Sequence, residues 1–189
     1  MRRFMLHLQN TVPYTPKHAT ILLQRARELV EPEASIRDAR ISKKYIEFDT
    51  SISEGIDVKT IIARIESIAP LAGYEEIIER HMEKDKAIAR AVQLFNDERY
   101  WEAHEVLEYL WKNATGIEKE ILNGIILVAA AFVHDEKGEP NVCISILRRA
   151  RKKLDPASGS NDYHGINTNR IADMISENIN TGKVHRFTI

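Results

Sequence analysis

The residues best suited to chemistry lie in one short segment, Tyr100 to Trp111, whose sequence is YWEAHEVLEYLW. If this segment is a helix, successive residues are rotated by about 100° around its axis. Trp101, His104, Glu108 and Trp111 then share a narrow arc, and the apolar residues take the opposite side. His104 and Glu108, four residues apart, can bind one ligand or each other.

A divalent metal is one interpretation of this arc. HEVLE differs from the zinc-binding pattern HExxH by having Glu108 at the second histidine, and histidine with carboxylates can hold zinc, manganese or iron. His134 is the nearest further histidine. A helical hairpin folded near residue 114 would place His104 opposite Asn123 or Gly124, which leaves His134 about 15 Å farther along. No cofactor is predicted, and a metal at His104, Glu108 and His134 stays an open alternative.

Two other interpretations use the same residues. His104 can act as a general acid or base with Glu108 orienting its imidazole. Alternatively, His104 and Glu108 are buried and satisfy each other beside Asn123, with the tryptophans filling the bundle and their indole N–H groups bonded to a partner. Gly124 fits either view, because a missing side chain leaves room for a tryptophan ring or a small ligand.

The helix that carries this arc needs neighbours, and a period of 3.6 residues indicates five helices after residue 81. They are expected at 83–95, 100–111, 117–137, from Pro140 to before Pro156, and at 168–179. Short connections make successive helices antiparallel, which predicts a bundle. The third helix is apolar on nearly every side, so it should lie at the centre. Residues 157–165 are expected to form a loop, and the tail VHRFTI an edge strand.

The first 80 residues alternate between periods of two and 3.6. Strands are expected at 3–10, on both sides of a turn at Ser42 to Lys44, and at Tyr74 to Ile78. Helices should follow Pro16 and Asp57. This strand–helix–strand–strand–helix–strand order predicts a ferredoxin-like antiparallel sheet backed by two helices.

The predicted third strand, KKYIEFDT (Lys43 to Thr50), bears on RNA recognition by this sheet. Its outward residues include one ring, Tyr45, beside Glu47 and Asp49. Modules that stack bases on an open sheet need several rings, and the two carboxylates would repel phosphate. Nucleic acid is therefore not an expected partner, and a solvated or dimer-forming face is favoured.

Composition excludes several classes of protein. The chain has 189 residues, 27 Lys plus Arg and 28 Asp plus Glu, so no net charge favours nucleic acid or an anionic membrane. Its single cysteine, Cys143, excludes a disulfide framework and suits a reducing compartment, with the cytoplasm as the expected location. Since no run of about 18 apolar residues occurs, no membrane span is expected.

The segments FNDERYWEAHEVLEYLW and ILNGIILVAAAFVHDEKGEP resemble the small helical family catalogued as domain of unknown function 309, over residues 84–154. Leu127 stands where a glutamine is expected from that family, and residues 1–80 lie outside the resemblance. The resemblance implies a helical fold and a site, and the family's name carries no activity. The matching positions are Phe95, Tyr100, Trp101, His104, Glu105, Glu108, Trp111, Gly124 and His134.

Together these observations predict an α+β chain: a βαββαβ ferredoxin-like sandwich over residues 1–80 and an all-α antiparallel helical bundle over 81–189. We expect a non-enzymatic module that binds a protein partner or a small ligand, with homo-oligomerisation left open. The alternatives are an acid–base or metal-dependent, hydrolase-like enzyme using His104 and Glu108, and RNA binding by the N-terminal domain. The expected pocket is lined by Trp101, His104, Glu105, Glu108, Trp111, Asn123 and Gly124.

Overall fold

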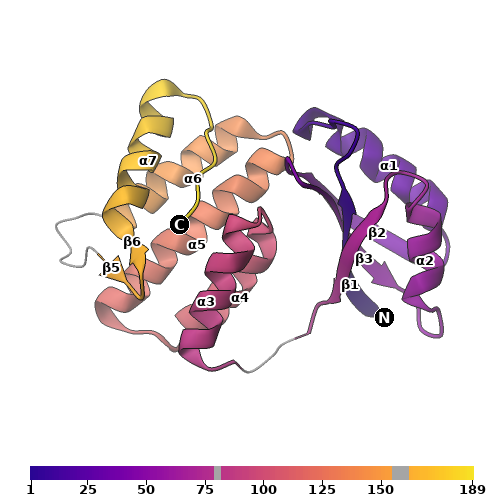
Figure 1. Cartoon of the computed structure of the whole chain (residues 1–189), viewed down its shortest axis with the longest axis horizontal. Helices are drawn as coiled ribbons and strands as arrows, with labels where there is room; N and C mark the ends of the chain where they lie inside the picture. The colour runs from indigo at the N-terminus through magenta and orange to yellow at the C-terminus, as the bar shows by residue number, and fades with distance from the viewer. Residues whose placement is uncertain (79–81, 155–161) are drawn as a thin grey trace. The chain divides into compact units, whose positions relative to one another are not determined.

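The computed structural model describes residues 1–78, 82–154 and 162–189 (Figure 1). The backbone divides into two compact units, Met1–Arg80 with Glu136–Gly138, and His81–Asp135 with Glu139–Ile189. Within the described residues, no helix is long and apolar enough to cross a membrane.

The N-terminal unit is a four-stranded antiparallel sheet with two helices on one face (Figure 1). The sheet order β2-β3-β1-β4 and the βαββαβ sequence of elements are those of a ferredoxin-like sandwich, as predicted. The elements are β1 (Arg2–Gln9), a 3-10 turn η1 (Pro16–His18), α1 (Ala19–Val30), β2 (Ala34–Ile41), β3 (Tyr45–Ile52), α2 (Val58–Ile65) and β4 (Leu71–Glu76).

Local sequence explains most of these bounds. Every second residue of β3, including Ile46, Phe48 and Ile52, packs into the core of this unit. Asp57 caps α2, since its carboxylate accepts a hydrogen bond of 3.0 Å from the Lys59 amide. β4 covers 71–76 instead of the expected 74–78, because its limits follow from pairing with β1, from Leu8 opposite Leu71 to Phe4 opposite Glu76.

The other face of the sheet carries a charged network. Arg3 donates two hydrogen bonds to Asp49, at 2.8 and 2.6 Å, and His7 Nδ1 lies 3.2 Å from Glu47. Arg40 lies 3.8 Å from both carboxylates. The prediction that this face is acidic and repels phosphate was based on the residues of β3 alone. The neighbouring strands add cations that balance its carboxylates.

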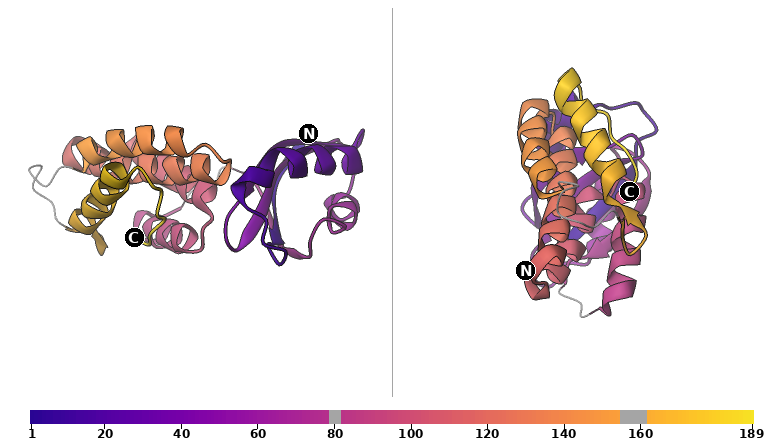
Figure 2. Two further views of the ribbon diagram at one scale, coloured as in Figure 1. Left: turned by 90° about the horizontal axis from the view of Figure 1, so that it is seen from above. Right: turned by 90° about the vertical axis from the view of Figure 1, so that its left-hand side faces the viewer.

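The C-terminal unit is helical. Its helices are α3 (Lys84–Asn96), α4 (Tyr100–Asn113), α5 (Gly116–Glu136), α6 (Pro140–Lys153) and α7 (Thr168–Thr181). Figures 1 and 2 show α6 alongside α5, and α3 alongside α4. The five predicted helices are therefore confirmed: α4, α6 and α7 begin at the expected residues, and the other ends differ by one or two residues.

Two details differ from the sequence-based expectation. Part of the expected loop is a small hairpin, β5 (Asp162–Tyr163) and β6 (Ile166–Asn167), while residues 157–161 lie outside the described part. The tail after α7 contains no strand in residues 182–189. Instead, Phe187 packs its ring 5.1 Å from Phe132, and Asn96 exchanges two hydrogen bonds with the backbone of Ile189, at 3.0 and 2.9 Å.

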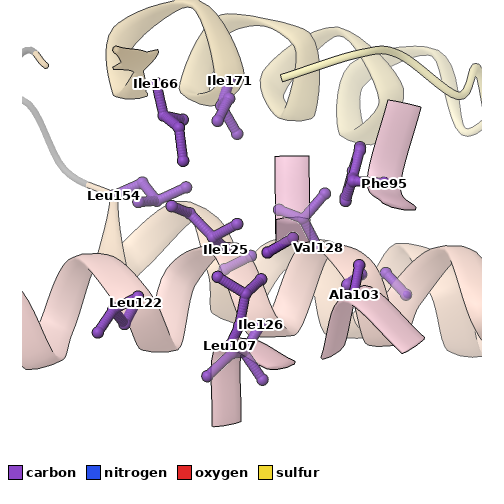
Figure 3. Close-up of a cluster of buried hydrophobic side chains, with 14 of the residues drawn as sticks. Phe95, Ala103, Leu107, Leu122, Ile125, Ile126, Val128, Leu154, Ile166 and Ile171 are labelled. Atoms are coloured by element: carbon purple, nitrogen blue, oxygen red, sulfur yellow. The ribbon is translucent and has the colours of Figure 1, made fainter. Parts of the chain in front are cut away.

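The core of the helical unit is built around α5, as predicted (Figure 3). Ile125 and Ile126 are buried there, with Leu107 reaching them from α4 and Leu154 from the end of α6. Cys143 is buried in the same core, and burial raises the pKa of its thiol to about 12. The thiol is therefore a packing group in this unit, since the thiolate is the reactive form.

Candidate functional site

One face of α4 packs into the core of the helical unit, and the residues of the predicted arc lie on the opposite, partly exposed face. Its buried apolar residues are Tyr100, Ala103, Leu107 and Leu110. In its first turn, Arg99 donates hydrogen bonds of 2.7 and 2.5 Å to Glu102, which joins the preceding turn to the helix. The opposite positions are half-buried: Trp101, His104, Glu108 and Trp111.

His104 lies in a cluster with two carboxylates. One ligand atom each from His104, Glu105 and Glu108 lies within 4.8 Å of the other two. The Nδ1 atom of His104 is 3.4 Å from Oε1 of Glu105. These two side chains are 26% and 46% exposed, whereas the Nδ1 atom of His104 is itself buried. Glu105, which lies outside the arc but belongs to the expected pocket, is the third member.

The spacing of these atoms fits a metal ion. Zinc–nitrogen and zinc–oxygen bonds are about 2.1 Å, which puts two ligands of a tetrahedral site about 3.4 Å apart. The His104–Glu105 pair already has that separation, and Glu108 needs only a side-chain rotation to approach it. Nδ1 of His104 has no hydrogen-bond partner in the described part of the chain, so no competing bond must break.

His134 does not join this cluster. Its Nδ1 lies 2.5 Å from Oε2 of Glu139, and its carbonyl accepts a hydrogen bond of 3.0 Å from the Glu139 amide. Both contacts tie the end of α5 to the start of α6. They give His134 a local structural role.

Trp111 lies in the arc but lacks the expected hydrogen bond. Its ring is half-buried, and Nζ of Lys119 lies 4.5 Å from the ring centroid. This distance is typical of a cation–π contact. Among the residues that the structure covers, its buried Nε1 atom has no acceptor. The indole therefore contributes packing and cation binding at this surface.

The space over Gly124 is filled by another residue. A Cβ atom at Gly124 would lie 2.5 Å from Cγ of Leu154, which occupies the room expected for a tryptophan or a ligand. Asn123 is half-buried, and no hydrogen bond joins it to His104 or Glu108 within the described ranges. The residues drawn together on α4 are thus His104, Glu105 and Glu108.

A pocket of about 570 Å³ lies elsewhere in the helical unit, between α3 and the β5–β6 hairpin. It contains Asp85 and His164, neither of which the sequence singled out as a site. In the sequence, His164 is an isolated histidine with no other chemically active residue at a helical or strand spacing. Asp85 is one of many acidic residues. Only the fold brings them together.

The helical unit is similar to other proteins of unestablished function. Residues 88–146 match a family described as "Domain of unknown function (DUF309)". A crystal structure of a conserved hypothetical protein from Thermus thermophilus is 31% identical, covering 52% of this chain and 99% of the other, with a TM-score of 0.43. No curated protein matches. The segment from α3 to α6 that carries His104, Glu105 and Glu108 therefore belongs to the DUF309 family.

Proposed function

We propose that the helical unit is a non-enzymatic binding module and that its ligand is a divalent transition-metal ion held by His104, Glu105 and Glu108. The observation that carries this proposal is the approach of one nitrogen and two carboxylate oxygens to within 4.8 Å. All three residues project from a single helix, so the cluster needs no rearrangement of the backbone.

The chemistry of the ligands sets the class of metal. Imidazole nitrogen suits zinc, copper, iron and nickel, and carboxylate suits harder ions such as manganese. One imidazole with two carboxylates therefore favours zinc, iron or manganese over calcium or magnesium. Three protein ligands leave a fourth position for a small molecule or a partner's side chain, which links this site to ligand binding.

Isothermal titration calorimetry of the full chain with Zn²⁺ and Mn²⁺ tests the proposal. The wild type should bind with one ion at this cluster, and Glu108→Gln should weaken that binding at least about tenfold, since even outer-sphere partners of a metal contribute about that much. Glu177→Gln is the matched control, because Glu177 is an exposed glutamate on α7. It should bind as the wild type does.

The competing interpretation, a packing role, makes a different prediction for stability. His104 is 26% exposed, so its pairing with Glu105 should contribute about 1 kcal/mol or less. A loss of several kcal/mol in His104→Ala would favour the packing role. Equal metal affinity in Glu108→Gln and Glu177→Gln would refute the metal site.

A further inference from the structure

The pocket between α3 and the β5–β6 hairpin has an apolar floor and a polar mouth. Its volume of about 570 Å³ lies within the range of small-molecule sites. Ile88 and Ile166, buried in the core of the unit, form part of the floor. The lining includes Asp85, Ile88, Ala89, Val92, His164 and Ile166.

The β5–β6 turn positions the imidazole at this mouth. His164 and Gly165 have φ of 50° and 86°, which is the two-residue turn with positive φ that joins tightly twisted strands. The Asp162 side chain accepts a hydrogen bond of 3.0 Å from the Gly165 amide and fixes the turn. As a result, Nδ1 of His164 lies 3.3 Å from Oδ1 of Asp85 on α3.

The charges around the mouth do not cancel. Lys84, the cation next to Asp85, is ion-paired with Glu118 of α5, which also accepts a hydrogen bond of 2.8 Å from the Tyr163 hydroxyl. Both contacts lower the pKa of Glu118, so its carboxylate stays ionised and neutralises the charge of Lys84. Asp85 is 83% exposed and its contact is with an imidazole. The carboxylate of Asp85 therefore places a negative charge at the mouth, over an apolar floor.

We propose that this pocket binds a small aliphatic ammonium compound. The alkyl chain would lie on Ile88, Val92 and Ile166, and the ammonium group would pair with the carboxylate of Asp85. An imidazole that donates through Nδ1 to a carboxylate keeps its other ring nitrogen as an acceptor for an ammonium N–H. Because the pocket is lined by branched aliphatic side chains, it favours a ligand whose main part is an alkyl chain. This site shares no residue with the metal cluster on α4, so each can fail without the other.

NMR titration of the full chain with hexylammonium, hexanol and hexanoate tests the proposal. Hexylammonium should bind up to about fivefold more tightly than hexanol, the effect of one exposed ion pair, and hexanoate more weakly than both. In Asp85→Asn, hexylammonium should fall to the affinity of hexanol. Asp173→Asn, at an exposed aspartate of α7, should leave the preference unchanged.

A second variant tests the location of the alkyl chain. Ala89 is exposed at the pocket's edge, so Ala89→Phe can fill the mouth without disturbing the core. It should abolish binding of both hexanol and hexylammonium. The proposal is overturned if hexylammonium causes no saturable shift, if hexanol binds equally well to the wild type, or if Ala89→Phe binds both compounds unchanged.

Discussion

Replacing Gly124 with alanine separates two opposing effects on the stability of the helical unit. In the interior of a helix, alanine is favoured over glycine by about 1 kcal/mol. Gly124 lies inside α5, so helix propensity alone predicts a more stable protein. The structure predicts the opposite sign, because Leu154 occupies the space that the new methyl group needs.

The size of the clash sets the magnitude. The added Cβ would lie 2.5 Å from Cγ and 2.6 Å from Cδ2 of Leu154, whereas carbon atoms in contact are about 3.5–4.0 Å apart. Leu154 is 3% exposed, and its Cγ is close to the backbone, so a small rotation cannot relieve the overlap. Overpacking of this kind costs about 1–3 kcal/mol. After subtraction of the propensity gain, we expect Gly124→Ala to lower the free energy of unfolding by up to about 2 kcal/mol.

Urea denaturation followed by tryptophan emission measures this effect in the helical unit, which contains Gly124. The two tryptophans of the chain, Trp101 and Trp111, both lie on α4, so the signal originates in the helical unit. Leu154→Ala should cost about 2–5 kcal/mol, and the double variant should cost less than the two single variants together by about 1 kcal/mol or more. Ala130→Gly on the same helix calibrates propensity. A stabilised Gly124→Ala would refute the reasoning.

Three further perturbations have defined outcomes. Phe187→Ala should destabilise the helical unit by about 3–5 kcal/mol, measured by the same tryptophan signal, because the ring is 8% exposed within an aromatic cluster; a cost below about 1 kcal/mol would mean that the tail is not docked. Asp57→Ala should cost the N-terminal unit about 1 kcal/mol in far-UV circular dichroism melts through loss of the α2 cap, and no change would contradict that role. Glu33 should titrate by NMR with a pKa of about 2, lowered by its hydrogen bonds with Arg64. A lowered carboxyl pKa contributes stability above the unfolded value of about 4.5, and this is lost as the pH falls through about 2; Arg64→Met should return the pKa to its ordinary range.

Periodicity predicted the elements because burial repeats along them. In β3, the apolar residues of the hydrophobic core alternate with polar ones, and in α5 nearly every side is covered by neighbouring elements, so the pattern is visible in the sequence itself. The limits of β4 were less accurate, since they follow from pairing with β1, which strand composition does not encode. The β5–β6 hairpin was missed because each strand has two residues, too few to show alternation.

The candidate site was predictable only where it lies within one helix. His104 and Glu108 share a face by spacing alone, whereas Glu105 enters the cluster through the reach of its side chain. The central place of α5 could be inferred, but contacts between particular side chains of different helices could not. Leu154 approaches Gly124 because of where α6 ends against α5. Counting residues along a helical hairpin does not predict that position.

The docking of the tail beside α3 has a consequence for the order of folding. The hydrogen bonds between Asn96 and Ile189 join residues 93 positions apart, while α3 and α4 meet through a short turn. Closing such a long loop costs more chain entropy than forming a helical hairpin, so local helix pairs should form first. The aromatic cluster of Phe95, Phe132 and Phe187 is then completed late, and the rate of folding should respond to the tail less than the rate of unfolding does.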